Sequence, residues 1–261
     1  MALGAVFFDF GGTLFSYSRV QGRAFYPILI DALERLGLDL EPRAAGRAYR
    51  KASADAFEAY APRPYYLHRD LFHETLRSWV RSLGGDEARA DAVFLDWFHE
   101  RQRCLVRDGF ELRSGCLEVL RALRAWGLHT AIVSNIDDDY LEPMVERAGL
   151  RAELDAWTSS EEARSCKPDP QIFRHALRKA GVRAREVLFV GDSPQHDIAG
   201  ARSLGMATVL IREPGVASPG GSGLPAVAPD FTIEQLGELL PIVRDLRERA
   251  PRAGVGASDA E

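Results

Sequence analysis

Short, uninterrupted apolar runs recur along the chain at the length of a β-strand. Four of them cover residues 5–8, 130–133, 187–190 and 208–211, and a weaker candidate covers residues 156–159. Hydrophobicity that is continuous rather than alternating predicts strands covered on both faces, as in a parallel sheet. We therefore expect a sheet that is buried between layers of helices.

Helical patterns separate these runs from residue 115 onward. Apolar stripes at helical spacing cover residues 117–123 and 172–180, and each is followed by a glycine that can end a helix. A last helix is expected over residues 233–249. Strands and helices that alternate in this way predict right-handed βαβ crossovers, and so an α/β protein with a Rossmann-like, doubly wound parallel sheet.

The segment from residue 16 to residue 110 breaks this rhythm. It contains helical stripes, among them residues 25–36 and 71–83, and no convincing strand. A run of helices between the first strand and the rest of a βα repeat predicts an inserted helical domain.

This pattern divides the chain into three parts. We expect residues 1–15 and 111–250 to form the Rossmann-like core, residues 16–110 the helical insertion, and residues 251–261 a disordered tail. Residues 214–229 are rich in Gly, Pro and Ser, which predicts a flexible surface loop rather than a binding element.

Composition limits the kinds of partner. The chain has 261 residues, of which 46% are hydrophobic and 27% charged, as is ordinary for a globular protein. A formal net charge of −5 argues against nucleic acid but leaves room for a small phosphate ester. No run of 18 apolar residues occurs, so no membrane span is expected. Three cysteines in no metal-like spacing predict reduced thiols in a cytoplasmic protein. We expect the protein to be a monomer or a homodimer.

The first predicted strand ends in residues suited to catalysis. Asp9 is followed by Gly11 and Gly12, whose backbone can approach an anion, and by the hydroxyl of Thr13. Open α/β sheets place ligands at the carboxyl ends of their strands, where Asp9 would lie. An aspartate before two glycines also forms an ordinary turn, so this segment alone does not define a site.

Two further aspartates, Asp192 and Asp197, follow the run at residues 187–190. Two buried carboxylates are costly unless a cation or hydrogen-bond donors hold them. Mg²⁺ prefers such oxygen ligands, so the pair is a candidate metal site. The alternative is that Asp197 only caps the following helix.

A hydroxyl, an amide and an amine complete the set. Ser134 and Asn135 follow the run at residues 130–133, and Lys167 stands before a helix start marked by prolines. Taken singly, Ser134 is explained as a helix N-cap and Lys167 as a solvated loop charge. Together with the aspartates they supply the parts of a phosphoryl-transfer site at one edge of the sheet.

These segments together resemble the haloacid dehalogenase-like superfamily of aspartate-nucleophile hydrolases. Its four motifs occur in order as VFFDFGGTL, AIVSN, CKPDP and VLFVGDSPQHD, and the match covers nearly the whole chain. The insertion at residues 16–110 resembles the superfamily's helical C1 cap, which largely sets substrate identity. Within it, the polar and aromatic residues 63–68 are a candidate substrate-facing loop, or else an ordinary helix connector.

The resemblance implies roles for the acidic residues. Asp9 would attack phosphorus and form an aspartyl-phosphate, which divides one difficult hydrolysis into two steps. Asp9, the backbone carbonyl of Gly11 and Asp192 would hold Mg²⁺, and Asp197 would support the metal site.

The resemblance also implies how phosphate is bound. Ser134 and Lys167 would bind the oxygens of the transferring phosphoryl group, with Asn135 and Thr13 as lesser contributors. The expected protein is a Mg²⁺-dependent phosphatase that acts on a small phosphorylated metabolite.

Gly11 departs from the pattern of the family's phosphatases, which usually carry a second aspartate at this position. That aspartate protonates the leaving group and later activates water, and such general acid–base help is worth about 10²–10⁴-fold. The candidate substitutes are His68, His73, Asp137, Asp138 and Asp139.

Three alternatives stay open. A 2-haloacid dehalogenase uses the same nucleophile, but the resemblance then predicts an aromatic residue in place of Gly11. A phosphonate hydrolase requires a cap lysine, and Lys51 is the only lysine among residues 16–110. A non-catalytic protein would have kept the fold and lost the acid.

Overall fold

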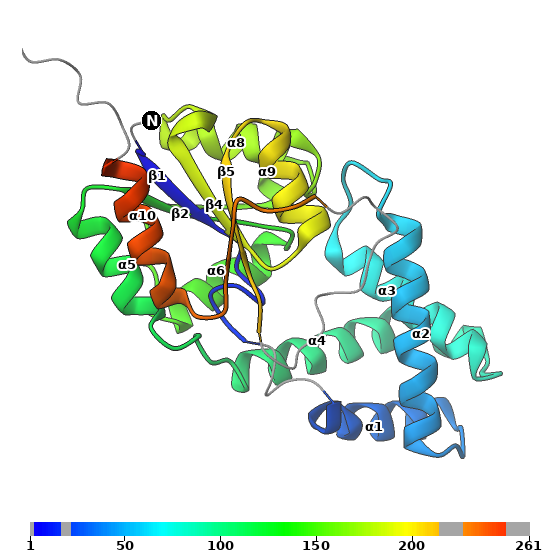
Figure 1. Cartoon of the computed structure of the whole chain (residues 1–261). Coiled ribbons are helices and arrows are strands. Elements are labelled where there is room, and N and C mark those ends of the chain that lie inside the picture. Colours follow the sequence, from blue (N-terminus) through cyan, green and yellow to red (C-terminus); the bar gives the residue numbers. More distant parts are fainter. Residues whose placement is uncertain (1–2, 17–21, 214–226, 249–261) are drawn as a thin grey trace, which may run out of the picture.

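The computed structural model describes residues 3–16, 22–213 and 227–248. Within these residues, six parallel strands form one sheet in the order β3-β2-β1-β4-β5-β6 (Figure 1). The strands are β1 Ala5–Phe8, β2 His129–Ser134, β3 Ala156–Ser159, β4 Val187–Gly191, β5 Ala207–Ile211 and β6 Phe231–Ile233. The order is that of a doubly wound Rossmann-like sheet, which confirms the predicted α/β class.

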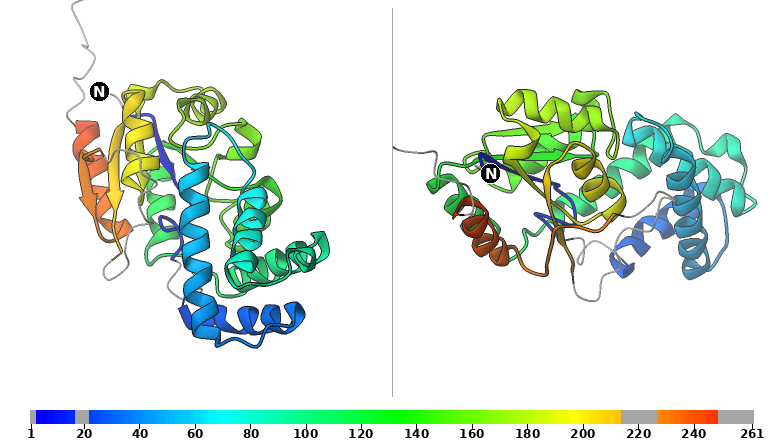
Figure 2. Two further views of the ribbon diagram at one scale, coloured as in Figure 1. Left: turned by 90° about the vertical axis from the view of Figure 1, so that its right-hand side faces the viewer. Right: turned by 45° about the horizontal axis from the view of Figure 1, so that its top comes forward.

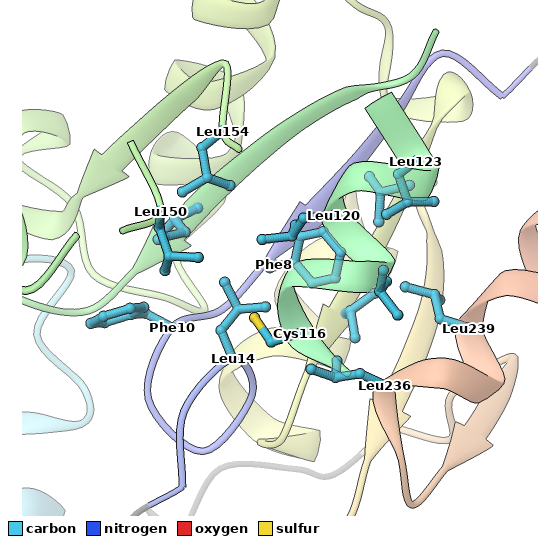
Figure 3. Packing of buried hydrophobic residues seen from close by; sticks show 14 of the residues in the cluster. Phe8, Phe10, Leu14, Cys116, Leu120, Leu123, Leu150, Leu154, Leu236 and Leu239 are labelled. Carbon is cyan, nitrogen blue, oxygen red and sulfur yellow. The ribbon is translucent and has the colours of Figure 1, made fainter. Parts of the chain in front are cut away.

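Helices cover both faces of the sheet. They are α5 Cys116–Ala125, α6 Asp138–Arg147, α7 Ser160–Ala163, α8 Pro170–Ala180, α9 Ala199–Ser203 and α10 Leu239–Glu248. Successive strand residues point to opposite faces, so Phe8 packs with α5, α6 and α10, while Phe7 packs with α8 and α9. Figure 3 shows Phe8 between the strands and α5, with Leu239 of the last helix beside them.

Four helices between β1 and α5 form a separate unit, which we call the helical unit. They are α1 Tyr26–Leu36, α2 Pro42–Tyr60, α3 His68–Ser82 and α4 Ala92–Asp108. Trp79 is fully buried among them and donates its indole N–H to the carbonyl of Ala45 at 2.9 Å. Figure 2 shows this unit lying to one side of the sheet. Its buried apolar side chains form a cluster of their own.

The chain leaves the sheet domain and returns to it along neighbouring segments. The N–H of Ser16 donates to the carbonyl of Glu111 at 3.2 Å, and the N–H of Arg113 donates to the carbonyl of Leu14 at 2.9 Å. The rings of Phe10, Phe15 and Phe110 pack together at this crossing, with centroid distances of 5.0 to 6.1 Å.

The C-terminal region differs from the prediction. The helix expected over residues 233–249 begins only at Leu239, and residues 231–233 form the edge strand β6. The carboxylate of Asp230 accepts hydrogen bonds from the N–H and the hydroxyl of Thr208, which ties β6 to β5. Most of the predicted loop (residues 214–226) and the predicted tail lie outside the described residues.

Membrane-spanning length and hydropathy are found together in none of the described helices. All three cysteines are free thiols.

Candidate active site

The site lies where the strand order of the sheet reverses. β1 and β4 are neighbours, but the chain continues from them to opposite edges, which opens a crevice at their carboxyl ends. Asp9 follows β1 and Asp192 follows β4, and the N–H of Asp9 donates to the carbonyl of Val190 at 2.9 Å. The topology therefore brings two aspartates from distant parts of the sequence to one point.

Lys167 lies at the centre of the buried polar groups. Its Nζ donates to Oδ1 of Asp9 and to Oδ1 of Asp197, each at 2.6 Å, and to the carbonyl of Val133 at 3.0 Å. Burial lowers the pKa of Lys167, but the charges of Asp197 and Asp9 outweigh burial and hold the pKa above its ordinary value. Lys167 is thus a buried cation, and its interpretation as a solvated loop charge is wrong.

Ser134 and Asn135 contact the same group in different ways. Ser134 donates its hydroxyl to Oδ1 of Asp9 at 2.9 Å, so it does not serve as a helix cap. Asn135 donates its side-chain N–H to the carbonyl of Lys167 at 2.9 Å and accepts from the backbone N–H of Lys167 at 2.6 Å. Asn135 therefore fixes the backbone from which the Lys167 amine reaches Asp9.

Three carboxylates form a cluster that fits a divalent cation. One oxygen each from Asp9, Asp192 and Asp197 lies within 4.8 Å of the others. Burial, followed by the charge of Asp9, raises the pKa of Asp192 to about 8. Burial also raises the pKa of Asp197, against the charge of Lys167. One lysine does not balance three clustered carboxylates, two of them buried, and a cation bound by hard oxygen ligands would.

Two glycines allow this close approach. Gly12 has a φ of +81°, and a Cβ there would lie 2.2 Å from an oxygen of Asp192. A Cβ on Gly191 would lie 2.4 Å from the carboxyl group of Asp197. Any larger side chain at either position would displace a candidate metal ligand.

Two residues near Asp9 lie in different surroundings. Gly11 lines the pocket together with Asp9. Thr13 is fully buried and is not among the residues that line the pocket. Within the described part of the chain, its hydroxyl has no hydrogen-bond partner. The structure thus brings Gly11 to the pocket and leaves Thr13 away from the pocket surface.

A pocket of about 740 Å³ contains Asp9 and extends between the sheet and the helical unit. Side chains of the helical unit line it from α2, α3, α4 and the α2–α3 connector. The principal ones are Tyr49, Arg50, Phe57, Tyr66, His68, Phe72, His99 and Arg103. Of the predicted substrate-facing stretch, Tyr66 and His68 reach the pocket, whereas Arg63 packs over Tyr60 at 3.8 Å.

Most of these lining residues were missed in the sequence. Tyr49, Ser53 and Phe57 are spaced four residues apart, so they share one face of α2, and the C-cap residue Ala61 follows at the same spacing. That spacing indicates a shared helix face from the sequence alone, but it does not show which part of the protein this face contacts. His196 was also missed, and it lines the pocket with its Nδ1 3.0 Å from the hydroxyl of Ser193.

The candidate substitutes for the missing acid have different partners. Asp137 accepts the backbone N–H groups of His68 and Arg69 at 2.8 Å each, and so caps α3 from the sheet domain. Burial lowers the pKa of His68 to about 4, and its Nδ1 has no hydrogen-bond partner among described residues. Asp139 forms an ion pair with Arg103 at 2.8 Å.

The other two candidates contact neighbouring side chains and do not line the pocket. His73 does not line the pocket, and its Nε2 lies 3.5 Å from the carboxylate of Asp96. Asp138 accepts a hydrogen bond from the hydroxyl of Ser159. Of the five candidates, His68, Asp137 and Asp139 therefore line the pocket.

The fold and the buried polar groups define an α/β protein with a candidate site at the topological switch point of a parallel sheet. A family model described as haloacid dehalogenase-like hydrolase matches residues 3–205. The chain belongs to this family of hydrolases, as the four motifs predict.

Relatives with established names differ in their activities. The chain is 30% identical to haloacid dehalogenase-like hydrolase domain-containing protein 3 of Bos taurus, over 83% of this chain and 85% of that protein. It is 29% identical to ribulose-1,5-bisphosphate 5-phosphatase of Halopiger xanaduensis, over 92% of this chain and 98% of that protein. It is 27% identical to pyrimidine 5'-nucleotidase YjjG of Escherichia coli, over 90% of this chain and 95% of that protein.

Solved structures share the fold. The HAD-hydrolase YfnB of Bacillus subtilis, whose structure has magnesium bound, aligns with a TM-score of 0.73 at 18% identity, over 94% of this chain and all of that one. The L-2-haloacid dehalogenase of Xanthobacter autotrophicus aligns with a TM-score of 0.66 at 22% identity, over 94% of this chain and 99% of that chain. A magnesium-bound hydrolase and a dehalogenase therefore share this fold.

Proposed function

We propose that this hydrolase is a Mg²⁺-dependent phosphatase that acts on a small phosphorylated metabolite through an aspartyl-phosphate on Asp9. The observation that carries the proposal is the cluster of Asp9, Asp192 and Asp197, in which Lys167 pairs with the buried Asp9 and Asp197. A metal-independent dehalogenase has no need of three clustered carboxylates at this point. The phosphatase and nucleotidase names among the relatives support the same choice.

Each residue of the site has a task in this reaction. Asp9 attacks phosphorus in line with the leaving oxygen. Ser134 and Lys167, which both donate to Oδ1 of Asp9, hold the phosphoryl oxygens beside it. Asn135 fixes the backbone of Lys167.

The metal would be held by Asp9, the backbone carbonyl of Gly11 and Asp192, with Asp197 in support. When bound, Mg²⁺ neutralises charge on the phosphoryl oxygens. Asp197 also accepts from Lys167 and from the N–H of Ser193 at 2.9 Å, which keeps the lysine and the acids in fixed relation.

The helical unit acts as the cap of residues 16–110 in this proposal, on a core of residues 1–15 and 111–250. Such a lid excludes water from the reacting groups. We also propose a cytoplasmic location, with which the free thiols agree, and a monomeric or homodimeric state.

The test is phosphate release from p-nitrophenyl phosphate and from a panel of sugar and nucleotide phosphates, with Mg²⁺ and with EDTA. Release that requires Mg²⁺ and falls to the uncatalysed rate in Asp9→Asn is the expected result. Asp245→Asn makes the same chemical change on the exposed face of α10 and is the matched control. A folded protein that releases phosphate from no ester would refute the proposal, and haloacids and phosphonates would be assayed next.

A further inference from the structure

The pocket that contains Asp9 has an aromatic wall. Tyr66, Phe72 and His99 line it, and the rings of Phe72 and His99 pack with centroids 5.4 Å apart. Phe57 also lines it and is 39% exposed, so its ring is accessible from the pocket. Flat apolar surfaces of this kind bind a ring of the ligand by stacking and by burial of apolar area.

Positive charge is scarce on the same wall. Among the described residues of the helical unit that line the pocket, Arg50 and Arg103 are the cations with fixed charge. Arg103 is already paired with Asp139 at 2.8 Å and with the carbonyl of the same residue at 2.6 Å. A second phosphoryl group would meet only Arg50, so the part of the ligand on this wall is an uncharged ring.

The position beside the nucleophile has no proton to give. Gly11 lines the pocket next to Asp9 and has no side chain. The imidazoles of His68 and His99 lie on the wall, but burial lowers both pKa values to about 4, so both are neutral at pH 7. Neither Gly11 nor these imidazoles can therefore protonate a leaving group, which favours one that departs as an anion.

We propose that the substrate is the phosphate monoester of an aromatic alcohol, bound with its ring against Phe57, Tyr66 and Phe72 and released as an aryloxide. This inference rests on the proposed phosphatase function and narrows it. An oxygen attached directly to an aromatic ring carries negative charge well, so its departure needs no acid at Gly11.

The two steps balance without a further reactant. An oxygen of Asp9 forms a bond to phosphorus while the bond between phosphorus and the aryl oxygen breaks. The electron pair stays on the aryl oxygen, which takes a proton from solvent. Water then attacks phosphorus, the bond from phosphorus to Asp9 breaks, and inorganic phosphate leaves with the proton of the water passing to solvent.

The decisive comparison is phenyl phosphate against benzyl phosphate, which has the same ring but an alkyl leaving oxygen. We expect kcat/KM to be higher for phenyl phosphate by about 10² or more, because an absent general acid costs that much. Acetyl phosphate, with a good leaving group and no ring, is expected to have a higher KM than phenyl phosphate. Equal kcat/KM for phenyl and benzyl phosphate would overturn the inference, and so would a nucleoside 5'-monophosphate as the best substrate.

Two variants test the missing general acid and the binding of the substrate ring separately. Gly11→Asp is expected to reduce the ratio of phenyl to benzyl phosphate turnover by roughly tenfold or more, since it installs the acid. Phe57→Ala is expected to raise KM roughly tenfold for phenyl phosphate, and less for acetyl phosphate. Val93→Ala is the control, because Val93 is 74% exposed on α4 and does not line the pocket. A Phe57→Ala enzyme with the KM of the parent would contradict the ring site.

Failure of the two proposals can be told apart. No phosphate release from any ester, acetyl phosphate included, would refute the phosphatase function and the inference with it. Mg²⁺-dependent release that is indifferent to the leaving group would leave the phosphatase function standing and refute the aromatic substrate alone.

Discussion

Lys167 holds two carboxylates in the interior of the protein. Its amine lies 2.6 Å from both Asp9 and Asp197, and all three side chains are buried. We expect Lys167→Met to lower the free energy of unfolding in EDTA by about 3–5 kcal/mol, because it leaves two buried carboxylates without their positively charged partner. Urea unfolding followed by circular dichroism measures this loss.

An exposed ion pair supplies the control for that measurement. Lys51 bonds Asp55 at 2.6 Å, but its side chain is 76% exposed. Lys51→Met is expected to cost less than about 1 kcal/mol, as exposed pairs do. If the two lysine variants lose the same stability, Lys167 does not carry the charge balance assigned to it.

Single residues of the site could be predicted where they follow a strand. Asp9, Ser134 and Asp192 stand directly after apolar runs, so a parallel sheet had to bring them to one edge. The hydrogen bonds between Asn135 and the backbone of Lys167 join residues 32 apart in sequence, and no local pattern specifies them. The burial of Thr13 likewise depends on how the turn after β1 packs.

At α3, a helix of one domain is capped by a residue of the other. Asp137, at the start of α6, accepts the first backbone N–H groups of α3 at His68 and Arg69. We expect Asp137→Ala to destabilise the docked position of α3 by about 1 kcal/mol, the usual value of an N-cap. Hydrogen exchange at those two amides should accelerate several-fold, and His68 should move away from the pocket.

The matched control is the ordinary N-cap of α4. Asp91 accepts the N–H of Phe94 at 2.8 Å within the helical unit. Asp91→Ala is expected to lower overall stability by a similar amount while the amides of His68 and Arg69 keep their protection. Unchanged exchange at these amides in Asp137→Ala would show that the contact does not hold the unit in place.

Long elements were predictable and short ones were not. The stripes at 117–123 and 172–180 lie within α5 and α8, and all five expected strands are present. Strand β6 has only three residues, and Ile233 also fits the apolar period of the following helix, so local periodicity favoured a helix. The segment becomes a strand because it pairs with β5, and the hydrogen bonds between Asp230 and Thr208 hold the two strands together at one end.

The metal cluster makes the stability of the whole molecule depend on pH. Burial and the charge of Asp9 raise the pKa of Asp192 to about 8, above the ordinary carboxyl value of about 4. The metal-free folded protein therefore binds a proton that the unfolded chain releases, and it loses stability as the pH rises through this window. Because Mg²⁺ requires the deprotonated carboxylate, we expect it to bind more tightly and to stabilise more at about pH 8 than at about pH 6.

Thermal unfolding with and without Mg²⁺ at the two pH values measures this effect. Asp192→Asn removes the titrating group, so it should weaken the Mg²⁺ shift at both values and flatten its pH dependence. An Mg²⁺ shift of the same size at both pH values in the parent protein would contradict the assignment of Asp192 as a ligand.

The arrangement of the helical unit against the sheet is the part that local sequence patterns left undetermined. Amphipathic stripes predict which face of each helix is buried, but α2 and α3 bury one face in the unit and line the pocket with another. The direction of that second face depends on contacts such as Cys166 N–H to the carbonyl of Pro64 at 2.7 Å, which join residues about a hundred apart.

The paired crossing at Ser16 and Glu111 has a consequence for the history of the molecule. Because the segments that leave and re-enter the sheet domain are hydrogen-bonded neighbours, a short turn could join them without moving any strand. A module attached in this way can be deleted, enlarged or exchanged by recombination while the nucleophile stays in register. The same chemistry can thus be inherited by descendants that recognise unrelated molecules, and chimaeras joined at these two residues are the natural starting point for engineering new specificity.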